Sequence, residues 1–159
     1  MTTQPTAGVT VISIDGMASM AQISLGVADA ERAGRFWMRA LGWVRLPARW
    51  AGDDWLVIGP PPGVPGVPIA MDLSGSPIQE QPRIHFDLDA GAVDLDTEVE
   101  RLVGLGAARV DWPHYPTPDE MGPGEMPFVV LADPEGNRFC VAGRRLAEAS
   151  LAENPGRKA

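Results

Sequence analysis

Four side chains of the sequence belong to types that bind metal ions or move protons: Gln22, Asp72, His85 and Cys140. Each lies in a short stretch of alternating apolar and polar residues, which is typical of a β-strand with one buried face. Side chains of a strand point alternately to opposite faces, so the apolar neighbours face a core and these four face away from it. Amide, carboxylate, imidazole and thiolate groups can all ligate metals. The alternation therefore predicts that the four groups share one face.

Eight stretches are expected to form strands: residues 22–27, 43–46, 54–58, 69–73, 84–88, 108–110, 128–132 and 138–142. Two amphipathic helices separate them. The first begins after Asp29 and ends at Gly42, and the second begins at Asp94 or Asp96 and ends at Gly106. Each helix has one apolar side, so we expect each to pack on one face of a sheet.

The elements repeat in the order strand, helix, strand, strand, strand. Gln22 and His85 are 63 residues apart, and the helix-ending Gly42 and Gly106 are 64 residues apart. This constant offset predicts a duplicated module. On the face opposite each helix the second module would place His85 and Asp87 from its first strand, and Arg138 and Cys140 from its last.

Composition limits which partners and which cellular location are expected for the protein. The chain has 159 residues, which fits one domain, and a formal net charge of −8 without a basic stripe, so a nucleic-acid partner is not expected. The single cysteine favours a reducing compartment. No apolar run is long enough for a membrane span, and the first basic residue is Arg32, which argues against a secretory signal. A cytoplasmic location is therefore expected.

Four segments resemble the vicinal oxygen chelate superfamily of glyoxalase I, extradiol dioxygenases, fosfomycin-resistance enzymes and bleomycin-resistance proteins. They are residues 23–29, Phe36-Trp37 with Ala40-Leu41-Gly42, residues 83–88, and residues 128–141 with the turn Asp133-Pro134-Glu135-Gly136-Asn137. The resemblance implies an α+β fold in which two paired βαβββ modules, residues 20–75 and 83–143, form a curved mixed sheet around a cavity. Residues 1–19 and 144–159 would be an N-terminal extension and a C-terminal tail, and the protein would be a homodimer.

In metal-binding members of that superfamily the ligands come from the first and fourth strands of each module. The resemblance therefore implies Gln22, Asp72, His85 and Cys140 as ligands of a divalent zinc, nickel, iron or manganese ion. Asp72 and Cys140 both stand where glutamate is usual. Without a glutamate at position 140, the proton transfer of glyoxalase I is not expected.

Three functional classes remain open. A metal-dependent enzyme of the lyase, isomerase or dioxygenase type would use Asp72 as its base and His85 as a ligand. A metal-free enzyme would instead use His85 with Asp87 as an acid/base pair. The third class is a metal-free binder of the bleomycin-resistance type, in which Asp72, Asp87 and Asp89 favour a cationic small molecule and aromatic rings stack on it. The candidate lining residues of that pocket are Trp50, Trp55, Trp112, Tyr115 and Phe128.

Overall fold

The computed structural model describes residues 19–48, 52, 55–117, 119–122 and 125–143. The predicted C-terminal tail, and the predicted N-terminal extension except Ser19, lie outside these residues. Within them the strands form two separate four-stranded mixed sheets. The predicted α+β class and the two-module architecture are confirmed, and element boundaries differ from the sequence expectation by at most two residues.

Each sheet contains the strands of one module. The first has the order β1-β4-β3-β2 and the second the order β5-β8-β7-β6, with β1–β4 and β5–β8 parallel and the other pairs antiparallel. The first module consists of β1 (Ile23–Val27), α1 (Ala30–Leu41), β2 (Val44–Leu46), β3 (Leu56–Gly59) and β4 (Ile69–Leu73). The second consists of β5 (Phe86–Asp89), α2 (Leu95–Leu105), β6 (Ala108–Arg109), β7 (Phe128–Ala132) and β8 (Arg138–Ala142).

Local signals explain where both helices begin and end. The carboxylate of Asp29 accepts a hydrogen bond from the backbone N–H of Arg32, and that of Asp94 accepts one from Thr97, so Asp94 and not Asp96 is the second N-cap. Both helices end at a glycine with a left-handed backbone, Gly42 at φ 66° and Gly106 at φ 118°.

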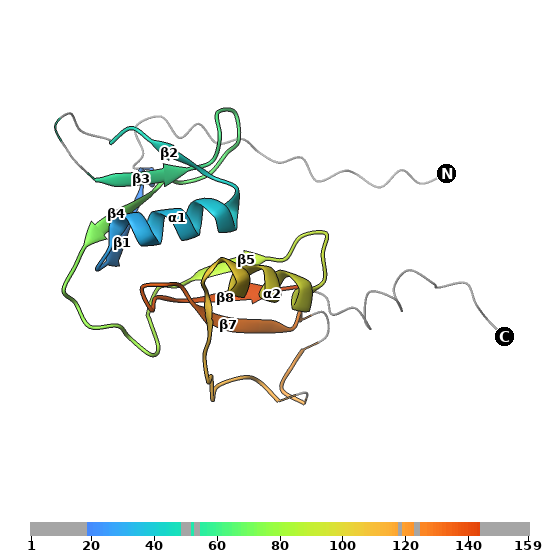
Figure 1. Cartoon of the computed structure of the whole chain (residues 1–159). Coiled ribbons are helices and arrows are strands. Elements are labelled where there is room, and N and C mark those ends of the chain that lie inside the picture. Colours follow the sequence, from blue (N-terminus) through green and yellow to red (C-terminus); the bar gives the residue numbers. More distant parts are fainter. Residues whose placement is uncertain (1–18, 49–51, 53–54, 118, 123–124, 144–159) are drawn as a thin grey trace, which may run out of the picture.

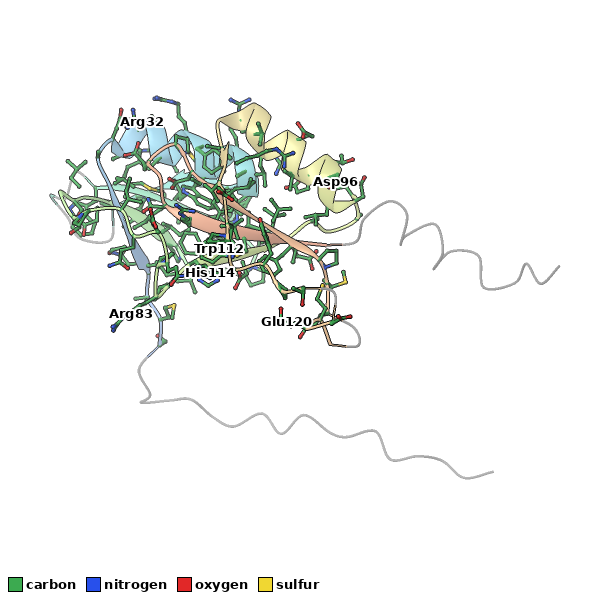
Figure 2. All side chains as sticks on the ribbon, turned by 90° about the horizontal axis from the view of Figure 1, so that it is seen from below. Arg32, Arg83, Asp96, Trp112, His114 and Glu120 are labelled. Atoms are coloured by element: carbon green, nitrogen blue, oxygen red, sulfur yellow. The ribbon has the colours of Figure 1, made fainter. Side chains whose placement is uncertain are left out.

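The two sheets share one core. Figure 1 shows the strands of the two modules as separate groups, with α1 on the side of the first module that faces the second, and Figure 2 places both helices on the same side of the sheets. Most apolar residues of β1, β4, β5 and β8 pack into that helix side, as the alternation predicts. Leu73 at the end of β4 and Ile84 directly before β5 do not, because they are 71% and 83% exposed at the strand ends. The Trp37 ring of α1 is fully buried and contacts the second module, with its centroid 5.2 Å from that of Phe86 and 5.1 Å from that of Phe139.

The turn between β7 and β8 holds the modules together. Asp133, Glu135 and Asn137 all reach the first module. The buried Asp133 carboxylate accepts a hydrogen bond of 2.9 Å from the Trp37 indole, and Asn137 donates to the Gly26 carbonyl at 3.1 Å. The shape of this turn needs Gly136 at φ 89°, a conformation that favours glycine.

Glu135 completes the connection at the start of α1. One carboxylate oxygen accepts hydrogen bonds from the backbone N–H groups of Ala28 (2.7 Å) and Asp29 (3.0 Å), and the other pairs with the Arg32 guanidinium. The Glu135 side chain is only 2% exposed, so these donors replace its water. A residue of the second module therefore binds the amino-terminal end of the first module's helix.

Candidate functional site

His85, Asp87 and Cys140 meet on the helix-free face of the second sheet. Asp87 of β5 lies directly opposite Cys140 of β8, and His85 lies two residues before Asp87 on the same face. One ligand atom from each lies within 4.8 Å of the other two, and His85 Nε2 is 3.3 Å from Asp87 Oδ1. Imidazole, carboxylate and thiolate are the ligand types that zinc takes, so this group fits a divalent ion by its donor set.

The Cys140 thiol is a poor nucleophile in this setting. Burial raises its pKa to about 11, and the negative charge and hydrogen bond of Asp87 act in the same direction. At neutral pH the sulfur therefore keeps its proton. A metal ion bound here would have to displace that proton, so its affinity would rise with pH.

Two cavities meet at His85. The larger, which we call the seam cavity, has a volume of about 410 Å³ and lies between the edge strands β1 and β5, closed at one end by the linker after β4. Its polar lining residues include Ser24, Ser74, Ser76, Gln79, His85 and Arg138. The smaller, which we call the Cys140 cavity, has about 210 Å³ and is lined by Gln81, Pro82, His85, Trp112, Val130, Arg138, Phe139 and Cys140.

The connection between β6 and β7 crosses the helix-free face. Trp112 and His114 stack edge to face with centroids 5.2 Å apart, and Figure 2 shows them together on the side of the sheets away from the helices. His114 also contacts Gln81 of the linker through a hydrogen bond. The Arg138 guanidinium lies over the Trp112 ring, 5.9 Å from its centroid. This loop therefore forms the outer wall of the Cys140 cavity.

Further along the same loop, Tyr115 packs on β7. Its hydroxyl accepts a hydrogen bond of 2.9 Å from the Val130 N–H, and its ring lies 5.4 Å from that of Phe128. Both rings line a third cavity of about 390 Å³, which also includes Val130. The three predicted lining residues thus lie at two different cavities, Trp112 at the Cys140 cavity and Tyr115 and Phe128 at the third, and their role in ligand binding stays a prediction.

The other predicted site residues are distributed differently. Asp72 lies on β4 opposite Gly26 of β1, in the first sheet, and is not part of the His85–Asp87–Cys140 group. Gln22 comes directly before β1, and neither it nor Asp72 lines one of the three cavities. Trp55 is 38% exposed directly before β3, and Trp50 lies outside the described residues.

Sequence reasoning assigned no role to two residues of the site. Arg138 lines both the seam cavity and the Cys140 cavity, and Gln81 lines the latter. The alternation of β8 already placed Arg138 on the correct face. Gln81 lies in an irregular linker without periodicity, so no sequence pattern could have placed it.

Comparisons with known proteins agree with this geometry. Residues 22–142 match the model of the glyoxalase-like domain family. No curated protein matches the sequence. Among solved structures, the fosfomycin resistance protein FosX from Listeria monocytogenes is similar with a TM-score of 0.58 at 18% identity, over 86% of this chain and 98% of that one.

Two further structures show the same fold. A glyoxalase/bleomycin resistance/dioxygenase family enzyme from Burkholderia phytofirmans has a TM-score of 0.56 at 17% identity, over 79% of this chain and 98% of its own. TnmS3, an antibiotic binding protein from Streptomyces, has a TM-score of 0.53 at 21% identity, over 81% and 98% of the two chains.

The extent of the family match decides the classification. It begins before β1 and ends with the last residue of β8, so it includes both modules and the turn that joins them. Neither helix of the described residues has the length and apolar character needed to cross a membrane. By its family match and by its two-module fold, the chain belongs to the glyoxalase-like domain family.

Proposed function

We propose that this protein binds a small organic molecule on the helix-free face, in the seam cavity and the adjoining Cys140 cavity. The observation that carries the proposal is the position of His85, which lines both cavities. Its side chain is 42% exposed, so the imidazole remains accessible to a ligand. Combined with the Trp112 ring, it gives the apolar surface and the few polar contacts that small-molecule sites use.

Two similar structures support a small-molecule ligand. TnmS3 is described as antibiotic binding, and one FosX structure holds Mn(II) and 1S,2S-dihydroxypropylphosphonic acid. Both share the fold with this chain at 21% identity or less. They support a small-molecule ligand for a protein with this fold. The chemical class of the ligand has to be inferred from the residues of this chain.

A substitution at His85 provides the test. His85→Ala should leave the unfolding transition unchanged and abolish the binding of small aromatic fragments. Fragment binding is measured by the shifts of amide NMR signals from residues around the seam cavity. Arg39→Ala on the exposed side of α1 is the control, because Arg39 lines neither the seam cavity nor the Cys140 cavity. Equal fragment binding by wild type and His85→Ala, or loss of folding in His85→Ala, would refute the proposal.

A second candidate is a metal-dependent enzyme, favoured by the group of three ligand atoms. His85, Asp87 and Cys140 would hold a divalent ion, which when bound would stabilise negative charge on a ligand oxygen. Asp87 lies 3.3 Å from His85 and can orient the ring or accept its proton. Gln22 and Asp72 stay predicted ligands from the first module. The role of Asp72 as a base also stays a prediction.

Metal analysis separates the two candidates. After loading with zinc or manganese and desalting, the metalloenzyme requires close to one ion per chain, and less than about 0.1 ion per chain would reject it. Cys140→Ser and Asp87→Asn should each lower the metal content, whereas Gln22→Ala and Asp72→Ala should do so only if the first sheet supplies ligands. The predicted homodimer is tested on the same samples by light scattering with and without metal.

A further inference from the structure

We infer that Arg138 binds an anionic oxygen group, such as a carboxylate or phosphonate, on the ligand of this protein. The inference rests on the proposed function, because it concerns the ligand of the same cavities. It assigns a charge to that ligand and a specificity-determining role to Arg138. The argument depends on which charges line the cavities and which of them are already neutralised.

The walls of the two cavities contain one charge without a partner. The seam cavity is lined by two residues that are charged at neutral pH, Glu135 and Arg138. Glu135 is neutralised by Arg32 and by two backbone N–H groups, and its side chain is 2% exposed. The Cys140 cavity contains Arg138 and no carboxylate among its lining residues. Arg138 is therefore the one charged lining residue of the two cavities that has no partner within the described residues, in a protein whose net charge is −8. The Asp87 carboxylate lies beside His85 and Cys140 but lines neither cavity.

Arg138 makes no ion pair within the part of the chain that the structure describes. Four other arginines, Arg32, Arg45, Arg101 and Arg109, each pair with a glutamate. Arg138 is half-buried, and its guanidinium rests on the Trp112 ring. A guanidinium that contacts an aromatic ring in this way keeps N–H donors free for a carboxylate or phosphonate, which it can bind in two-pronged geometry.

The neighbouring groups are suited to the same ligand. His85 and Gln81 offer further hydrogen-bonding atoms beside Arg138, and Trp112 offers an apolar ring face. The carboxylates that favoured a cationic guest in the sequence analysis, those of Asp72, Asp87 and Asp89, line neither cavity. The geometry therefore favours an anion attached to an apolar or aromatic body.

Three probes of one shape and different charge test the inference on the full chain. Benzoate is anionic, benzamide neutral and benzamidine cationic, and phenylphosphonate distinguishes a tetrahedral from a planar anion. We expect benzoate or phenylphosphonate to shift the amide signals of His85 and Arg138 in NMR titrations. Their dissociation constants should be at least about tenfold lower than those of benzamide and benzamidine, because the charge-assisted hydrogen bond is missing in the latter.

Variants show whether Arg138 is responsible. Arg138→Gln should weaken anion binding about tenfold or more, and Arg138→Lys should retain part of it because the charge stays. Arg39→Gln on the exposed side of α1 changes the net charge equally and should leave binding unchanged. Equal binding of all four probes, or equal loss in Arg138→Gln and Arg39→Gln, would overturn the inference alone. Absence of binding by every probe would overturn both it and the proposed function.

Discussion

The indole N–H of Trp37 donates a hydrogen bond of 2.9 Å to the carboxylate of Asp133, 96 positions later in the chain. Trp37 is fully buried and Asp133 is 3% exposed, so water cannot replace either partner. Asp133 also accepts hydrogen bonds from the backbone N–H groups of Glu135 and Asn137 within its own turn. The Asp133 carboxylate thus fixes the position of the β7–β8 turn relative to α1.

Asp133→Asn should therefore lower the free energy of unfolding by about 1–3 kcal/mol, because the amide cannot accept hydrogen bonds with both of its polar atoms. Urea denaturation of the purified variant measures the loss. Asp111→Asn is the matched control, since Asp111 is exposed, and its stability should equal that of wild type. Similar transitions for both variants would show that the Trp37–Asp133 contact is not important for stability.

Glu135 makes stability depend on pH. Burial alone would raise the pKa of its carboxyl, but hydrogen bonds from Arg32, Asp29 and Ala28 outweigh burial and hold the pKa below its ordinary value of 4.5. A lowered folded-state pKa stabilises the fold above the ordinary value, and this contribution is lost as pH falls through the folded-state pKa. Glu135→Gln should thus be about 1–3 kcal/mol less stable than wild type at pH 7.

The difference in the free energy of unfolding between wild type and Glu135→Gln should become smaller as the pH is lowered below 4.5. In that range protonation removes the charge of Glu135 from the wild-type protein as well. Urea unfolding at several pH values measures this difference. Glu80→Gln is a suitable control, because Glu80 is exposed and makes no side-chain hydrogen bond or ion pair within the described residues. A difference that stays constant with pH would contradict the proposed role of the charge.

Two helical glycines should respond in different ways to alanine. At Gly104 of α2 a new Cβ would meet nothing within 4 Å, so Gly104→Ala should raise stability by about 0.5–1 kcal/mol through helix propensity. At Gly34 of α1 the same Cβ would lie 2.6 Å from the Leu56 side chain, which is buried. Gly34→Ala should therefore be at least about 1 kcal/mol less stable than Gly104→Ala. Thermal denaturation of the pair tests this difference.

The thiol of Cys140 should react slowly at neutral pH, because its pKa is raised to about 11 by burial and by Asp87. Asp87→Asn removes the negative charge and should increase the rate of iodoacetamide alkylation at pH 8 at least about threefold. Cys140 is the single cysteine, so mass spectrometry of the intact protein reports this site alone. Asp89→Asn, opposite Ala142 on the same sheet face, should leave the rate unchanged. Equal rates in both variants would exclude the effect of Asp87.

Residue patterns with a local cause could be predicted from sequence. The caps at Asp29, Gly42 and Gly106 and the alternation in β1, β4, β5 and β8 follow from neighbours in the chain. The structure has them as expected, except that Leu73 at the end of β4 is exposed. Alternation also placed His85, Asp87 and Cys140 on one face, and in the structure Asp87 lies directly opposite Cys140. These predictions needed only the geometry of a single strand or helix.

Contacts between distant segments could not be predicted in this way. The position of Glu135 at the start of α1 depends on how the two modules pack, and no periodicity encodes it. The same holds for Trp112 over Arg138, because the loop path is irregular. The sequence places Asp72 in the first module, but it cannot say that the two modules form separate sheets and that Asp72 lies outside the group of His85, Asp87 and Cys140.

No backbone ladder within the described residues connects β1 with β5, although the two edges face each other across the seam cavity. The spacing of those edges is therefore set by side chains, above all by the turn that ends in Asn137 and by the linker before His85. Substitutions in these two segments can widen or narrow the binding site while each sheet keeps its own hydrogen bonds. Ligand preference and the integrity of each half are thus free to evolve separately.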